Sequence, residues 1–257
     1  MVISYPGYWL GQVSSFGNLA VSPLSVELAD RCAAELRDHG NPYTHYCRAM
    51  YYDHVPRDRE LAEEAWEKAV TNSTGDLWRT IYTSFLLEHY GIERALAEFE
   101  KAGKNRSLFS MSFEARLLAL DSPERKQRAA AMWEQIGKKD REERPVVISV
   151  PAILGDRIGI RRVAGNWRQD GVNWLVPRLE YLTGEVTEED FVSDYRASSL
   201  LLVAMEAIGA NDREKAMRYL EQVEDQWPLV HYEALWAKGI LAEMRRRPDW
   251  PVMPVSN

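Results

Sequence analysis

Cysteine and histidine are scarce in this sequence, and long runs of apolar residues are missing from it. Two of the 257 residues are cysteine and five are histidine, so neither a disulfide framework nor a site built from many histidines is predicted. No stretch approaches the roughly 20 consecutive apolar residues that a membrane-spanning helix needs. The apolar start of the chain has no basic residues and is interrupted by Pro6, Gly7, Gly11 and Gly17, unlike a secretory signal. We therefore expect a cytoplasmic protein with no membrane partner.

The signatures of common catalytic and cofactor sites are missing as well. The sequence has no H-E-x-x-H, G-x-S-x-G, P-loop or G-x-G-x-x-G pattern, and the G-D-R-I-G stretch at 155–159 is too short for a phosphate loop. The densest group of candidate metal ligands is His45, Cys47, Asp53 and His54. On one helix, however, His45 and His54 would point in directions about 180° apart. We predict no catalytic residues, no metal site and no cofactor.

Positive charge is not concentrated in any part of the chain. The sequence has 32 basic and 39 acidic residues and a net charge of −7. Its basic clusters, Lys138–Lys139, Arg161–Arg162 and Arg245–Arg247, are too short to follow a phosphate backbone. No nucleic-acid partner is therefore predicted. The apolar content of 46% is sufficient for a folded core.

What the sequence does contain is one helical register that recurs. Each copy has a small residue, a bulky apolar residue four positions later, and a small or apolar residue three positions after that. The copies are Ala62, Trp66 and Ala69; Ala95, Phe99 and Ala102; Ala129, Trp133 and Ile136; and Ala216, Leu220 and Val223. These spacings place the three residues on one helical face. The first three alanines are 33 and 34 residues apart, a period typical of stacked helix pairs.

Each of these helices follows a second predicted helix. The preceding helices cover residues 41–55, 76–91, 107–122 and 195–211; single helices at 22–40 and 230–247 flank the series. Gly91 is placed to end one helix in a left-handed conformation, and Asp121 or Ser122 can cap the helix that begins at Pro123. The chain is thus expected to alternate between two helices per unit.

This alternation resembles the tetratricopeptide repeat family, whose second helix carries A-x3-F-x2-A and whose units commonly close with a proline. Segment 198–228 shows the spacing best, with Asn211 at the turn where the family usually has glycine, and Pro228 at the end. The V-P-x-D linker before the Ala62 helix is similar to the Sel1-like subclass, with Val55, Pro56 and Asp58 matching. The resemblance implies an all-α fold, a right-handed superhelix of stacked antiparallel helix pairs (an α-solenoid).

Residues 145–195 depart from the register and contain three prolines and five glycines. We expect degenerate helices at 152–164 and 172–183 and a helix capped by Thr187, with a strand at V-V-I-S-V as the alternative. The expected organisation is an aromatic arm at 1–21, a repeat domain at 22–247 that is irregular at 145–195, and a tail at 248–257.

The resemblance implies a protein-interaction scaffold or adaptor that binds a peptide or partner protein on the inner face of the superhelix. Residues of the first helix of a unit line that face, which selects Tyr51 and His54 in one unit and Leu201 and Met205 in another. Burial of Leu201 against the next unit remains the alternative.

Two other regions are candidate contact surfaces. Trp167, Arg168 and Trp174 lie in the irregular segment, and Trp and Arg are enriched at interface hot spots. The aromatic arm at 1–21 either caps the stack or docks on another chain. Two other functions stay open: an enzyme with its site around 145–195, and a subunit that assembles only into homo-oligomers.

Overall fold

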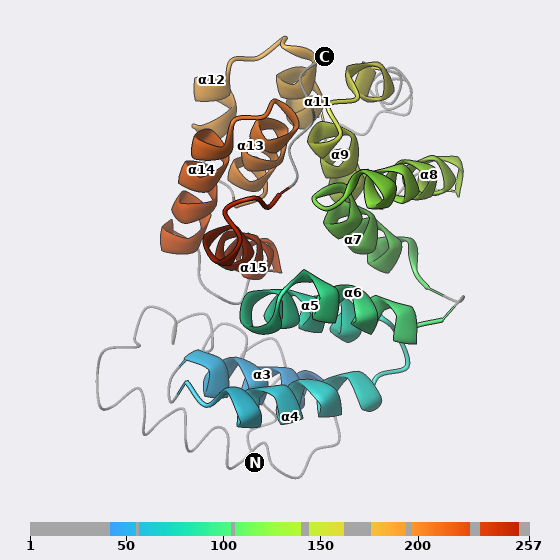
Figure 1. Cartoon of the computed structure of the whole chain (residues 1–257), viewed down its shortest axis with the longest axis vertical. Coiled ribbons are helices and arrows are strands. Elements are labelled where there is room, and N and C mark those ends of the chain that lie inside the picture. Colours follow the sequence, from blue (N-terminus) through green and yellow to red (C-terminus); the bar gives the residue numbers. More distant parts are fainter. Residues whose placement is uncertain are drawn as a thin grey trace, which may run out of the picture.

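A computed structural model describes residues 42–54, 57–103, 106–139, 144–161, 176–193, 197–226 and 232–251. Within these ranges the protein is all-helical and contains no strand (Figure 1). The helices are α3 (Pro42–His54), α4 (Arg59–Thr71), α5 (Leu77–Tyr90), α6 (Ile92–Lys101), α7 (Leu108–Ala119), α8 (Pro123–Lys139), α9 (Arg144–Ile153), α11 (Val176–Thr183), α12 (Glu188–Val192), α13 (Ala197–Gly209), α14 (Arg213–Gln226) and α15 (Tyr232–Arg246). The all-α prediction is confirmed, and the alternative of a strand at V-V-I-S-V is wrong because that stretch lies in α9. The predicted arm at 1–21 and the helix at 22–40 lie outside the described residues, as does the tail from 252 onward.

Short polar side chains set where these helices begin. The Ser122 hydroxyl accepts a hydrogen bond from the Arg125 backbone N–H at 3.3 Å, so Ser122 caps α8 as expected. The Thr187 side chain accepts one from the Asp190 N–H at the start of α12. Gly91 ends α5 with a φ of +93°, in the positive region that favours glycine. Local sequence signals therefore predicted these boundaries correctly.

The recurring register is a buried face in all four helices. Its members are fully or almost fully buried, apart from the half-buried Ala102. Among them Trp66 is 1% exposed and packs edge-on against Tyr46 of the preceding helix. The alanines permit close helix contact and the bulky residues fill the space beside it.

Consecutive helices joined by short connections pack against each other in pairs: α3 with α4, α5 with α6, α7 with α8, and α13 with α14. One extensive contact, however, departs from a stack in which each unit touches only its neighbours. Helix α15, near the C-terminal end, packs against α5 in the first half of the chain (Figure 1). Helix α9 packs on both α7 and α13 and so connects the two halves on the other side.

The contact between α15 and α5 is close because Gly239 has no side chain. A Cβ on Gly239 would lie 2.9 Å from the Ser84 carbonyl oxygen. At the end of α15, the Arg246 guanidinium donates to the carbonyl oxygens of Leu87 and Glu88. Deeper in the protein, the Trp236 ring of α15 lies 4.7 Å from the Phe113 ring of α7. The sequence period predicted a stack in which each helix pair contacts only its neighbours. Such a period cannot reveal a contact between helices that are far apart in the sequence.

Candidate functional site

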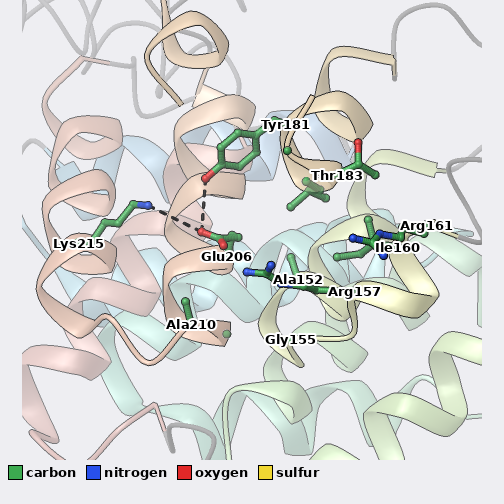
Figure 2. A pocket seen from close by; sticks show the side chains of 13 residues that line it. Ala152, Gly155, Arg157, Ile160, Arg161, Tyr181, Thr183, Glu206, Ala210 and Lys215 are labelled. Carbon is green, nitrogen blue, oxygen red and sulfur yellow. Dashed lines mark hydrogen bonds and ion pairs between the residues drawn. The ribbon is translucent and has the colours of Figure 1, made fainter. Parts of the chain in front are cut away.

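A pocket of about 330 Å³ lies where α9, α11, α13 and α14 meet (Figure 2). It is lined by Ala152, Gly155, Arg157, Ile160, Arg161, Tyr181, Leu182, Thr183, Gly184, Glu206, Gly209, Ala210 and Lys215. Its volume is within the range of small-ligand sites, about 300–1,000 Å³. Three cations, one carboxylate and one phenol supply its charged and titratable groups.

The end of α9 and the turn after it form one wall. Gly155 ends the helix with a φ of +65°, and the Asp156 N–H donates to the Pro151 carbonyl at 2.9 Å, which reverses the chain. The Asp156 carboxylate then accepts from the Gly159 N–H at 2.8 Å and caps a helical turn at 157–161. This turn presents Arg157 and Arg161, four residues apart, to the pocket.

The two arginines are exposed, and neither guanidinium forms a hydrogen bond or ion pair with any residue in the ranges that the structure describes. The capping carboxylate of Asp156 is engaged by a backbone N–H instead. Between the arginines, Ile158 is 82% exposed, the most exposed large apolar side chain among the described residues. The turn therefore carries two cations that have no partner among the described residues, together with an exposed apolar side chain.

The opposite side of the pocket is an ordered polar network (Figure 2). The Tyr181 hydroxyl of α11 and the Lys215 ammonium of α14 both point at Glu206 of α13, at 3.4 and 3.8 Å. Lys215 also lies 2.5 Å from Glu188 of α12, which accepts a hydrogen bond from the Tyr219 hydroxyl at 2.6 Å. Lys215 is thus shared by two carboxylates.

Protonation states in this network are well defined. Burial raises the pKa of Tyr181, and the Glu206 and Glu188 charges raise it further, so the phenol stays protonated and acts as a donor. Burial alone would raise the pKa of Glu188. The hydrogen bonds from Lys215 and Tyr219 outweigh burial, and the pKa lies below its ordinary value. At neutral pH Tyr181 is therefore a hydrogen-bond donor and Glu188 an ionised acceptor.

The turn between α13 and α14 places Lys215 at the pocket. Asn211 adopts a φ of +64°, the left-handed conformation that a glycine would adopt easily. Asp212 then caps α14 by accepting from the Lys215 backbone N–H at 3.0 Å. The asparagine that departs from the tetratricopeptide pattern thus has the conformation which the usual glycine would supply.

The structure does not join the predicted inner-face residues into one surface. Leu201 is 3% exposed and Met205 is fully buried, because α13 is packed by α9, α14 and α15. Tyr51 is half-buried on α3, with its ring 5.4 Å from that of Tyr52. Figure 1 shows α3 and α13 far apart along the long axis of the molecule. Leu201 and Met205 are therefore core residues, which corrects their expected place on an open groove.

Other predicted site residues are only partly described. His54 belongs to the last turn of α3, and its side chain lies outside the described residues. Trp167, Arg168 and Trp174 also lie outside the described residues.

One group of metal-ligand types does assemble, although not the one considered in the sequence. Asp53 of α3 lies 2.7 Å from His89 of α5, and ligand atoms of Asp53, Glu88 and His89 are within 4.8 Å of one another. The Lys238 ammonium of α15 lies 2.8 Å from Glu88 and supplies a positive charge there. This cluster links α3 to α5 through the contact between Asp53 and His89, and α5 to α15 through the ion pair between Glu88 and Lys238.

The pocket residues were missed because they come from four separate elements. The available signal was the pair of arginines spaced by four in the 157–161 stretch, inside the segment that breaks the helical register. Nothing local indicated that Lys215 and Glu206 would face them.

No protein-family model, curated protein or solved structure matches this chain. Within the part of the chain that the structure describes, no helix is both long and apolar enough to cross a membrane.

Proposed function

We propose that this protein is a helical-repeat scaffold or adaptor that binds a peptide segment of a partner protein at the pocket between α9, α11, α13 and α14. The helix pairs and the recurring buried register support the resemblance to tetratricopeptide repeats and a superhelical arrangement. The cytoplasmic location expected from the sequence is part of the same proposal.

One observation carries the choice of site: two arginines that have no partner among the described residues line a pocket, and the exposed Ile158 lies next to Arg157 in the sequence. Arg157 and Arg161 supply charge, and Ile158 supplies apolar area that burial by a partner would remove from water. Arginine is enriched in interface hot spots. A single exposed isoleucine far from a pocket would not indicate a binding site. A peptide with an acidic group next to an apolar side chain fits this arrangement.

Site-directed crosslinking tests the site. A photoreactive amino acid at Ile158, in the full-length protein in its source cells, should capture a partner. The charge reversal Arg157→Glu/Arg161→Glu should abolish capture. The matched control Arg57→Glu/Arg59→Glu reverses two exposed arginines at the start of α4 and should leave capture unchanged. Equal capture by the wild type and both variants would exclude the pocket as the binding site.

An enzyme acting on a small anionic substrate is the second candidate. The observation in its favour is that Arg157, Arg161 and Tyr181 come from the irregular 145–195 segment, where the enzyme alternative placed a site. Conversion of a bound anion over time, followed by NMR, would favour the enzyme over the adaptor. A mass above that of one chain in light scattering, without a partner, would favour self-assembly.

A further inference from the structure

We propose that the pocket recognises a phosphate monoester, carried by a phosphorylated side chain of the partner segment. This inference rests on the proposed function, because it assigns the chemical class of the group that the same pocket binds.

Charge balance is the first reason. The pocket lining holds Arg157, Arg161 and Lys215 against a single carboxylate, Glu206, in a chain whose net charge is −7. Lys215 is already neutralised by Glu188 and Glu206. The two arginines remain without a counter-charge among the described residues. A phosphate monoester carries about −1.5 to −2 at neutral pH and neutralises both, whereas a carboxylate neutralises one.

Donor geometry is the second reason. A guanidinium presents several N–H donors in a planar fork that matches phosphate oxygens, and two guanidiniums on one helical turn can share one phosphate. Arg157 and Arg161 lie four residues apart on the 157–161 turn, and both line the pocket. In Figure 2 the Arg157 side chain extends toward Glu206, whereas Arg161 lies farther from the Lys215 and Glu206 pair.

The nearby acids do not cancel this positive charge. Asp156 precedes the turn, and its Oδ1 accepts from the Gly159 N–H at 2.8 Å. Glu206 is held on the far side by Tyr181 and Lys215. Both carboxylates still repel an anion through space, and this repulsion grows with the charge of the ligand. The preference for a doubly charged ligand therefore comes from the two arginines.

The volume is the third reason. A cavity of about 330 Å³ has room for a phosphorylated side chain together with neighbouring peptide atoms. The exposed Ile158 beside the arginines supplies an apolar contact for the residue next to the phosphate.

The test uses the full-length protein and three oriented peptide libraries that differ only at a central phosphoserine, glutamate or serine. Binding is measured by fluorescence anisotropy at one fixed salt concentration, because charge-driven affinity depends on salt. We expect the phosphoserine library to bind at least about tenfold more tightly than the glutamate library. Arg157→Gln/Arg161→Gln should remove that preference, and Arg57→Gln/Arg59→Gln should retain it.

Competition with free inorganic phosphate and free O-phosphoserine separates the two sources of a phosphate group. Weak displacement by either compound, with tight binding of the phosphopeptides, supports a phosphorylated partner. Binding of the free compounds without any peptide binding would overturn the partner and indicate a small phosphate ester. Equal affinity for phosphoserine and glutamate peptides would overturn the phosphate while peptide binding stands. If no library and no free phosphate binds, the phosphate inference is wrong, and the Ile158 crosslink still decides the proposed function separately.

Discussion

Gly209, the last residue of α13, lies directly against the carbonyl oxygen of Ala152 near the end of α9. A Cβ at position 209 would be 2.0 Å from that oxygen and 3.1 Å from the Ile153 carbonyl oxygen. Both Gly209 and Ala152 line the pocket, so the close contact of these two helix ends defines its floor.

Gly209→Ala should destabilise the protein although alanine is the better helix former. Helix propensity alone predicts stabilisation of up to about 1 kcal/mol. The clash with backbone atoms instead forces the helix ends apart, at a cost of about 1–3 kcal/mol in the free energy of unfolding. Urea denaturation measures the difference. Gly75→Ala is the control, since a Cβ there meets nothing within 4 Å, and an equal or higher stability for Gly209→Ala would contradict this packing.

Trp236→Ala should cost about 3–5 kcal/mol of stability, because it removes a fully buried ring between α15 and α7. The measurement is chemical denaturation followed by circular dichroism. Leu77→Ala, at a position that is 46% exposed, should change stability by less than about 1 kcal/mol. Similar effects of the two substitutions would mean that α15 is not packed into the core.

Glu188→Gln should reduce stability by about 1 kcal/mol near neutral pH, since it removes the ion pair with Lys215 and weakens the hydrogen bond that Tyr219 donates. The folded-state pKa of Glu188 lies below its ordinary value of 4.5. The stabilisation is therefore complete above about pH 4.5 and is lost as the pH falls through the lower, folded-state pKa. Unfolding free energies of wild type and variant, measured between pH 7 and pH 3, should converge at the acid end. If the difference in unfolding free energy between wild type and variant stayed constant with pH, the ionised Glu188 carboxylate would not be the source of that difference.

Glu206→Gln should strengthen binding of a phosphoserine peptide by several-fold, because it removes the one carboxylate that lines the pocket. Fluorescence anisotropy gives the affinity. Glu60→Gln removes an exposed carboxylate at the start of α4 and serves as the matched control. An unchanged or weaker affinity for Glu206→Gln would show that the phosphate does not approach this wall.

Affinity for the phosphoserine peptide should fall several-fold between pH 7.5 and pH 5.5, because the phosphate monoester takes up its second proton with a pKa of about 6. The two arginines keep their charge over this range. A sulfate-ester peptide, which stays singly charged throughout, is the comparison ligand and should show no such fall. Parallel pH profiles for the two peptides would mean that the second phosphate charge is not recognised.

Local patterns were sufficient for much of the fold. A spacing such as that of Ala62, Trp66 and Ala69 indicates which face of a helix is apolar. That face is expected to be buried in any compact helical protein. Caps such as Ser122 and Thr187 bind backbone groups within three residues, so the neighbouring sequence is sufficient to predict them. These interactions are short in sequence, and a single chain reveals them.

The expected exposure of Leu201 and Met205 was wrong for a different reason. Leu201 and Met205 share a helical face, and the neighbouring sequence does not indicate which element covers that face. The covering helices α9 and α15 come from distant parts of the chain. Arg157, Arg161 and Lys215 likewise become a site only when α9 and α14 meet around α13.

The sequence by itself thus determined the apolar faces of the repeated helices and several helix ends, because those depend on residues one to seven positions apart. The helix expected at 152–164 was wrong, since α9 ends at Ile153 and a separate helical turn covers 157–161. Only the tertiary structure decided that α15 packs on α5, that Gly209 contacts Ala152, and that two arginines without a partner among the described residues line a pocket. Those features depend on which surfaces, distant in the sequence, fit together in the fold. A close helix contact such as that of Gly239 with Ser84 leaves no periodic pattern in the sequence.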